Sequence, residues 1–253
     1  MTDHLQITGE TKVILPPESK QKKPFFPRDV LIRIARLLMV QSDYLCTAGL
    51  MKGKMGLVIY FYKLGKILSH QNYERFAGFL LQEVCESLKY YSSISFYSGL
   101  TGIGYALEYL FRNNYIKEYP ESVMKNIDEL ILERDVNRIK NTGLDKGIKG
   151  IGYYVIYRTA NRDKRTIDDE YITNLISILT KIDDDECREL SVLLWDILNN
   201  KIIRNGYPDV FRKIISQVEY DDEMIFDTNR LPGIWKSGYA GIGLKIIENG
   251  IKI

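Results

Sequence analysis

Five segments of the chain carry apolar residues along one face of a predicted helix. In residues 121–139, for example, Val123, Ile127 and Leu130 recur at intervals of three or four residues, which is the spacing of an amphipathic helix. The same pattern predicts outer helices, with one face toward a core and one toward water, over residues 27–46, 72–91, 121–139, 169–182 and 208–219.

A second set of segments is apolar around most of its circumference. The stretches MGLVIYFYKL at residues 55–64 and IGYALEYLF at residues 103–111 are examples. A helix that is apolar on most sides is buried on most sides. We therefore expect inner helices over residues 54–69, 100–113, 148–160, 186–199 and 239–249.

A glycine-rich motif precedes four of the five inner helices. The motif reads GLMKGKMGL at residues 49–57, SFYSGLTGIG at 95–104, GLDKGIKGIG at 143–152 and GIWKSGYAGIG at 233–243. Its anchoring glycines, Gly53, Gly99, Gly147 and Gly238, are separated by 46, 48 and 91 residues, so a unit without glycines falls in the last interval. A repeat of this length is typical of helical hairpins.

The repeat predicts an all-α fold of about five hairpins, each made of an outer helix, a Gly-rich loop and an inner helix. Such hairpins stack either into a solenoid or into an (α/α) toroid, a barrel of inner helices ringed by outer ones, and the spacing fits both. Residues 1–26 lack periodicity and read as a flexible N-terminal arm, which leaves residues 27–253 as one domain.

The glycines have an architectural role in this interpretation. Glycine permits a positive φ where the chain turns out of one helix, and a close backbone approach where the next helix begins. The loops then place free N–H groups at one end of the fold, where a ligand site can form. The structural glycines are Gly49, Gly53, Gly56, Gly99, Gly102, Gly104, Gly143, Gly147, Gly150, Gly152, Gly233, Gly238, Gly241 and Gly243.

Side chains in and beside these loops are candidates for binding a ligand. Lys52, Lys146 and Lys236 would form a positive rim for an anion or an acidic peptide, or would only solvate the loops. Aromatic residues anchor peptides and sugars, or pack beneath the loops. Those at the loops are Tyr44, Phe96, Tyr97, Trp235 and Tyr239. The predicted ligand-binding residues are Lys52, Tyr97, Asp145, Lys146, Trp235, Lys236 and Tyr239.

Composition and charge narrow the setting. The 35 basic and 33 acidic residues of the 253-residue chain leave a net charge of +2, which gives no electrostatic case for nucleic acid. No apolar run reaches the roughly 18 residues of a membrane span, and the N-terminus lacks the apolar core of a signal peptide. Three widely spaced cysteines, Cys46, Cys85 and Cys187, indicate reduced thiols. These features predict a cytoplasmic protein.

The Gly-rich motifs also carry a resemblance to a known family. The stretches GLMKGKMG, YSGLTGIG, GLDKGIKGIGYYVIYR and WKSGYAGIG resemble the inner-helix motifs of the lanthionine synthetase C-like (LanC-like) family. They are most similar to its shorter, divergent members in Bacteroidetes-type peptide-maturation loci. The resemblance covers residues 45–253 and implies an (α/α) toroid of six or seven hairpins, of which about five are visible here.

The resemblance also implies a chemistry. Cyclases of the family hold one zinc with two cysteines and one histidine, and the zinc activates a precursor-peptide thiol for addition to a dehydrated serine or threonine. The first ligand lies in a W-C-Y-G motif, which matches Trp235-Lys236-Ser237-Gly238 and puts Lys236 at the ligand position. A C-H-G motif should follow about one repeat later, and none stands before Ile253.

The other cysteines and histidines do not replace these ligands. His4 and His70 are the two histidines, and neither has ligand spacing to Cys46, Cys85 or Cys187. We expect no metal and no other cofactor. We interpret the chain as a non-catalytic peptide-binding or scaffolding component of lanthipeptide-type maturation, whose partner is a precursor peptide or a maturation enzyme.

Two other functions stay open on the sequence. (α/α) toroids also occur in carbohydrate-active hydrolases and lyases, which use a pair of carboxylates, and the catalytic candidates here are Asp145, Glu108 and Asp43. Glu108, on the second inner helix, would otherwise need a partner such as Arg112, four residues further on. The other alternative is a helical repeat module that binds a partner protein along its surface.

Overall fold

The fold is described here from a computed structural model, which covers residues 27–160, 166–201, 208–227 and 229–250. Over these residues the secondary structure is helical, and no strand is present. The helices are α1 (Pro27–Gln41), α2 (Lys54–Leu68), α3 (Gln71–Ser87), α4 (Leu100–Arg112), α5 (Glu121–Leu132), α6 (Ile148–Thr159), α7 (Asp169–Leu179), α8 (Asp185–Leu198), α9 (Val210–Ser216), α10 (Asp222–Phe226) and α11 (Tyr239–Glu248). Short 3-10 turns are η1 (Ser42–Tyr44), η2 (Leu88–Tyr90), η3 (Val136–Arg138) and η4 (Trp235–Ser237).

The all-α prediction is confirmed, and the five predicted inner helices correspond to α2, α4, α6, α8 and α11. Burial follows the apolar pattern closely in the helices that a Gly motif opens. In α4, for example, every residue from Leu100 to Leu110 is buried. The unit without glycines behaves differently, because α8 buries one face and leaves Val192 and Trp195 exposed. Its first turn is capped instead by the Asp184 side chain, which accepts a hydrogen bond from the Cys187 N–H at 2.9 Å.

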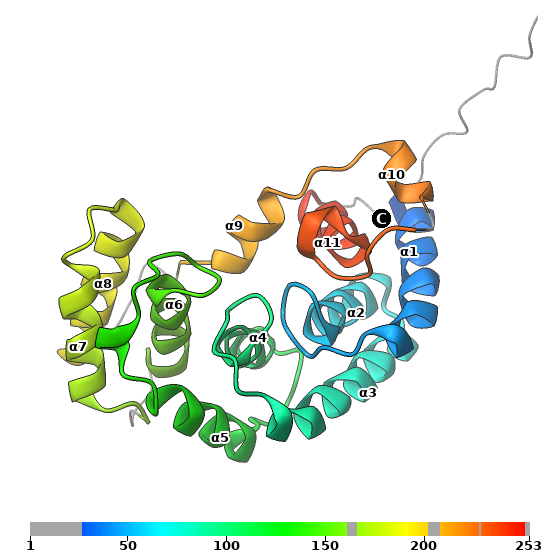
Figure 1. The fold of residues 1–253 in the computed structure, drawn as a ribbon. Coiled ribbons are helices and arrows are strands. Elements are labelled where there is room, and N and C mark those ends of the chain that lie inside the picture. The colour runs from blue at the N-terminus through cyan, green and yellow to red at the C-terminus, as the bar shows by residue number, and fades with distance from the viewer. Residues whose placement is uncertain (1–26, 161–165, 202–207, 228, 251–253) are drawn as a thin grey trace, which may run out of the picture.

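The inner and outer helices form the two layers of an (α/α) toroid. Figure 1 shows α11, α2, α4 and α6 side by side along the inside of an arc, with α1, α3 and α5 on its outer side. The core lies between the two layers and continues between neighbouring inner helices. Among the described helices, none is long and apolar enough to cross a lipid bilayer.

The hairpins pair in a different order from the one that the sequence predicted. Each Gly-rich loop was expected to join two helices packed on each other, but α2 packs most closely on α3, which follows it, and α1 packs on α11. The turn from α2 to α3 explains this, because Ser69 adopts a left-handed conformation with φ of 52° and reverses the chain within two residues. Helix α1 therefore supplies the outer cover of the last inner helix.

The prediction that residues 208–219 form an outer helix is wrong. Helix α9 lies on the inner side of the arc, between α6 and α11 in Figure 1. The Phe211 ring packs 5.2 Å from the Tyr109 ring, centroid to centroid, on α4. Polar contacts hold α9 to the helices on either side of it. Its Lys213 pairs with Glu186 of α8 at 2.8 Å, and Lys245 of α11 donates to its Ser216 carbonyl at 2.6 Å. Apolar periodicity shows that a helix has a buried face but not which layer it covers.

The predicted N-terminal arm, residues 1–26, lies outside the described residues. The described chain begins with α1 at Pro27, which is where the predicted domain starts. The assignment of residues 27–253 to one domain stays a prediction.

Candidate functional site

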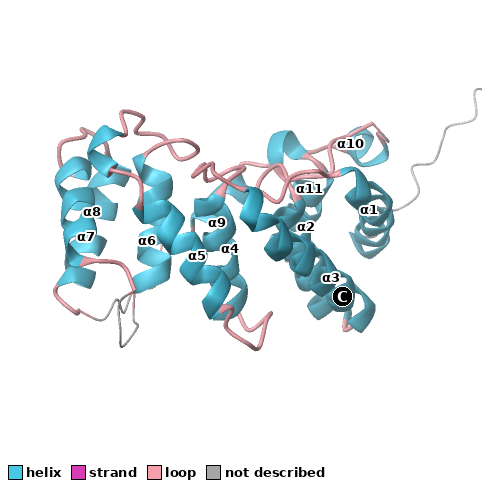
Figure 2. Cartoon of the chain, turned by 60° about the horizontal axis from the view of Figure 1, so that its bottom comes forward, coloured by secondary structure: helices cyan, strands magenta, loops and turns pink. Residues whose placement is uncertain are grey.

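The Gly-rich loops meet at one end of the fold, as Figure 2 shows. Backbone hydrogen bonds join them into a continuous band. The N–H groups of Ile234 and Trp235 both donate to the Met51 carbonyl, at 2.8 and 2.9 Å, and the Met51 N–H donates to the Tyr97 carbonyl at 2.8 Å. The Phe96 N–H in turn donates to the Asp145 carbonyl at 2.6 Å. We call this surface the loop face; it consists of residues 45–53, 92–99, 141–147 and 231–238.

Close backbone approach, rather than positive φ, requires the glycines of the loop face. The residues before the inner helices, Gly53, Gly99, Gly147 and Gly238, all have extended backbone, with φ between −134 and −64°. A Cβ atom on any of them would lie within 3.0 Å of a backbone carbonyl oxygen in its own loop. This is the close backbone approach that was expected where each inner helix begins. The positive φ values of the loop face occur at Lys236 and Ser237 instead, both at 53°.

The same crowding recurs about one turn into α2, α4, α6 and α11, the four inner helices that a Gly motif precedes. Cβ atoms at Gly56, Gly102, Gly150 and Gly241 would each lie within 3.0 Å of a carbonyl oxygen of the preceding loop. The remaining motif glycines meet other loops or neighbouring helices. A Cβ at Gly104 or Gly243 would strike a tyrosine ring, and one at Gly49 or Gly233 would strike the backbone of the adjacent loop. A Cβ at Gly143 would lie 3.1 Å from the Asn141 side chain, and one at Gly152 would lie 3.3 Å from Leu190.

A cavity of about 250 Å³ opens at the loop face, where the first, second and fourth loops meet α9. Three predicted ligand-binding residues, Tyr97, Trp235 and Lys236, line it together. The Tyr97 and Trp235 rings lie 5.1 Å apart, and Lys52 places its Nζ atom 4.7 Å from the Trp235 ring. The other lining residues are Met51, Ile214, Gln217, Val218, Ile234 and Ser237. We call this cavity the loop pocket.

Sequence reasoning missed the contribution of α9 to the loop pocket. Ile214, Gln217 and Val218 come from the end of α9 and the residues after it. No motif marks them, and the helix had been assigned to the outer layer. Their position depends on the tertiary contacts of α9 alone, so no local signal in the sequence could have placed them.

The predicted lysine rim is partly assembled. Lys52, Lys146 and Lys236 are all exposed. Lys236 lines the loop pocket and Lys52 covers its tryptophan, whereas Lys146 stands on the third loop and does not line the cavity. Two cations and two aromatic rings at one opening suit a ligand that carries both negative charge and aromatic or apolar groups.

Asp145 holds two loops together. Its carboxylate accepts hydrogen bonds from the Ser95 hydroxyl and, at 3.1 Å, from the Tyr97 N–H. The pKa of Tyr97 is raised, first because the ring is partly buried and further by the negative charges of Asp145 and Glu186. Asp145 therefore positions the Tyr97 segment at the loop pocket.

Tyr239, a predicted ligand-binding residue, does not line the loop pocket. It is fully buried, and its hydroxyl donates to the Asp227 carbonyl. Phe96 is also fully buried, beneath the second loop, whereas Tyr44 is exposed beyond α1. Among the aromatic residues of the motifs, Tyr97 and Trp235 are the two that reach the loop pocket.

The three catalytic candidates have different surroundings. Glu108 is fully buried and has no exposed surface at the loop face. Its carboxylate accepts from the Tyr119 hydroxyl and lies 3.5 Å from both Arg112 and Arg158, which confirms the partner four residues on. Asp43 is exposed on η1, and Asp145 is engaged with the second loop.

Beneath Glu108 lies a buried ionic network that joins α4, α5 and α6. Arg158 of α6 is fully buried and reaches Asp128 of α5 at 2.8 Å. Tyr154 donates its hydroxyl to the same carboxylate. A buried charge is tolerated when it is paired and hydrogen-bonded, and this network meets that condition.

A second polar cluster, centred on Glu186, joins α6, α8 and α9. Burial by itself raises the pKa of Glu186, but hydrogen bonds from Lys213, Tyr153 and Lys149 outweigh burial and hold the pKa at about 2, against an ordinary 4.5. The Lys149 and Lys213 ammonium groups lie 2.9 and 2.8 Å from the carboxylate. The cluster fixes α9, and with it one wall of the loop pocket.

The depressed pKa of Glu186 predicts a specific loss of stability in acid. The folded chain binds fewer protons than the unfolded chain between about pH 4.5 and 2, so the stabilisation is complete above this range and is lost as the pH falls through it. We expect Glu186→Gln to lower stability at pH 6 and to flatten its decline toward pH 3, in urea unfolding curves measured at both pH values. Glu189→Gln, three residues along α8, is the control, and an equal flattening in both variants would contradict this assignment.

The cysteines do not form a metal site with the described residues. Cys46 is exposed, Cys85 is half-buried on α3, and Cys187 is buried on α8. Burial first, and then the charge of Asp184, raises the pKa of Cys187 to about 11, which favours the thiol over the metal-binding thiolate. Within the described ranges, no group of three or more His, Cys, Asp or Glu side chains is placed to hold a metal ion.

Comparison with known proteins gives one match. A family model described as lanthionine synthetase C-like protein matches residues 47–201, which is more than half of the chain. The match runs from the first Gly-rich loop to the end of α8 and includes three of the four motifs. Neither a search of curated proteins nor a search of solved structures finds a match.

Proposed function

The chain belongs to the lanthionine synthetase C-like family, and from this premise we propose that it is a peptide-binding component of peptide natural-product maturation. The peptide binds at the loop pocket. Its role is to hold a precursor peptide or a maturation enzyme rather than to close thioether rings with zinc.

The observation that carries the proposal is the arrangement of Tyr97, Trp235 and Lys52. The two rings form one side of an open cavity, and an ammonium group lies at 4.7 Å from the indole ring. Aromatic side chains give a peptide a large contact area at low cost in conformational entropy. Lys236 adds a second exposed cation at the opening, which favours acidic peptides.

The donor set at the loop face argues against the zinc chemistry of the family's cyclases. Lys236, at the position that the motif resemblance assigns to a cysteine ligand, is a cation with no lone pair to offer while it is protonated. The loop face holds one cysteine, Cys46 in the first loop; its thiol donates to the Tyr44 carbonyl at 3.7 Å, and among the described residues it is not part of a group of three or more metal-binding side chains. The residues present therefore do not fit the metal, and no catalytic step is proposed through it.

The carbohydrate-active alternative has no comparable support. Two carboxylates some 5–10 Å apart in an open cleft are the usual requirement. Glu108 has no exposed surface, and its partners are Tyr119 and two arginines. Neither Asp43 nor Asp145 lines the loop pocket.

A binding experiment with a defined probe tests the proposal. The probe is a fluorescein-labelled ten-residue Gly/Ser peptide that contains two Glu and two Phe, and its twin carries Lys in place of Glu. We expect the acidic probe to bind more tightly in a fluorescence anisotropy titration, and Trp235→Ala to weaken its binding by about tenfold or more, which is the loss expected for a central aromatic anchor.

The second tryptophan of the chain provides the control. Trp195 is exposed on α8, away from the loop pocket, so Trp195→Ala should leave the affinity unchanged. Equal losses in the two tryptophan variants, or equal binding of the acidic and basic probes, would contradict a peptide site at the loop pocket.

A further inference from the structure

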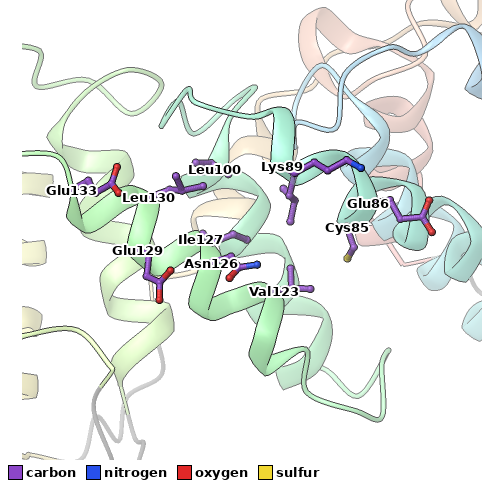
Figure 3. Close-up of a pocket in the computed structure, with 11 residues that line it drawn as sticks. Cys85, Glu86, Lys89, Leu100, Val123, Asn126, Ile127, Glu129, Leu130 and Glu133 are labelled. Atoms are coloured by element: carbon purple, nitrogen blue, oxygen red, sulfur yellow. The ribbon is translucent and has the colours of Figure 1, made fainter.

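A second cavity lies on the outer layer of the fold, between α3 and α5. It measures about 390 Å³ and is drawn in Figure 3. Its apolar lining comes from Leu88, Leu100, Val123, Ile127 and Leu130. Leu100, Leu88 and Ile127 are buried, whereas Val123 and Leu130 are partly exposed. We call this cavity the outer groove.

The groove lies between α3 and α5 because each of these outer helices packs along a different inner helix. Helix α3 packs along α2, where Gly65 allows Glu74 to approach so closely that a Cβ would lie 2.5 Å from its Cγ atom. Helix α5 packs on α4, where Gly104 admits Ile127 at 3.2 Å from the position of a Cβ. The first turn of α4, at Leu100, is left as the floor between them.

The α5 wall of the groove is acidic. Glu129, which lies 3.9 Å from Lys125, and Glu133, the C-cap residue of α5, stand four residues apart on one side of the groove, and both are exposed. Glu86 adds a third carboxylate, from α3. Lys89 also lines the groove, but its Nζ atom lies 5.0 Å from the centroid of the Tyr90 ring, and Figure 3 shows the side chain pointing away from α5.

From this combination we propose that the outer groove binds an amphipathic helix of a partner protein, whose apolar stripe is flanked by lysine or arginine. A groove between two helices with an apolar floor accepts side chains at i, i+3, i+4 and i+7 of a third helix. Cations beside that stripe would face the row of Glu129 and Glu133, which fixes the orientation of the partner and excludes acidic helices.

The outer groove and the loop pocket have no lining residue in common. One is formed by α3, α4 and α5, and the other by three Gly-rich loops and α9. A peptide in the loop pocket and a partner helix in the outer groove can therefore bind at the same time. The chain would then hold a peptide beside the protein that acts on it, which gives a physical basis for scaffolding.

The test uses the full chain and two synthetic helices. One 16-residue peptide carries leucine at i, i+3, i+4 and i+7 and lysine at the flanking positions, and its twin carries glutamate at those flanking positions. In fluorescence anisotropy titrations we expect the lysine peptide to bind about tenfold more tightly than the glutamate peptide at low salt. Equal affinities would overturn the charge argument and with it the proposal.

Variants of the α5 wall locate the binding. The double variant Glu129→Lys with Glu133→Lys should weaken binding of the lysine peptide by about tenfold and strengthen binding of the glutamate peptide. The control, Glu118→Lys with Glu189→Lys, makes the same change in net charge at exposed positions elsewhere. Equal effects of the two double variants would overturn the assignment to the groove.

Filling the groove gives a readout that does not depend on charge. Asn126 lines the cavity and is exposed on α5, so Asn126→Trp should block the lysine peptide, whereas Asn126→Ala should not. Trp235→Ala should leave this peptide's affinity unchanged, which separates the groove from the proposed function of the loop pocket. A concentration-dependent dimer that Asn126→Trp abolishes would show instead that a second copy occupies the groove, and would overturn the proposal.

Discussion

Gly102→Ala is expected to destabilise the fold by about 3 kcal/mol, at the upper end of the range for overpacked cores. Gly102 lies in the first turn of α4, and an added Cβ would lie far inside 3.0 Å of the Phe96 carbonyl oxygen. The obstacle is backbone, which cannot rotate away. The loop that would have to move also carries the Phe96 and Tyr97 backbone hydrogen bonds of the loop face, so the damage should spread to its neighbours.

The matched control is Gly78→Ala, in the interior of α3. An added Cβ there would find the Tyr62 hydroxyl at 3.7 Å as its nearest neighbour, which is ordinary contact. Alanine is the better helix former by about 1 kcal/mol, so this variant should be stabilised. Urea unfolding measures both changes, and a stability of Gly102→Ala close to that of the parent chain would contradict the crowding at the loop face.

Asp128→Ala is expected to cost about 3–5 kcal/mol, because it leaves a buried guanidinium without its closest carboxylate. Arg158 is fully buried, and Asp128 lies 2.8 Å from it. The Tyr154 hydroxyl, which donates to the same carboxylate, would lose its acceptor as well. The substitution should therefore destabilise the buried contact between α5 and α6 more than other contacts of the fold.

A neighbouring acidic residue on α5 serves as the control for this prediction. Glu129 is exposed and lies 3.9 Å from Lys125, so Glu129→Ala should change stability by no more than about 0.5 kcal/mol. Thermal and urea unfolding of the two variants give the comparison. Similar small effects in both would show that the Arg158 network contributes little to the fold.

The helices of the fold could be predicted in detail from the sequence because the Gly-rich motifs mark where the inner helices begin. The predicted starts at residues 54, 100, 148 and 239 coincide with those of α2, α4, α6 and α11. The pairing of helices could not be predicted in the same way. That α1 packs on α11 depends on a contact between two helices about 200 residues apart in sequence, and no local pattern encodes it.

Helix α9 shows where periodicity stops being informative. Its apolar residues Val210, Phe211, Ile214 and Ile215 give the pattern of an outer helix, yet it fills the inner side of the arc. The choice between the two layers depends on contacts that are distant in sequence. Phe211 meets Tyr105 and Tyr109 of α4 there.

The residues of the candidate site could be predicted where a polar or aromatic residue lay on a loop, because loops lie at the surface. Tyr97, Trp235 and Lys236 lie on loops and reach the loop pocket. Tyr239 and Glu108 lie within helices, where the direction of the side chain decides between core and surface. Both point into the core, and a single sequence does not reveal that direction.

The central claim is that this family member binds a peptide and lacks the zinc ligands of the family's cyclases. The most direct test is elemental analysis of the purified full chain, after incubation with excess zinc and gel filtration. We predict no stoichiometric zinc, because Lys236 stands at the expected ligand position and the described Cys, His, Asp and Glu residues form no group that could hold a metal. One zinc per chain would contradict this view and would point to a thiol-activating cyclase.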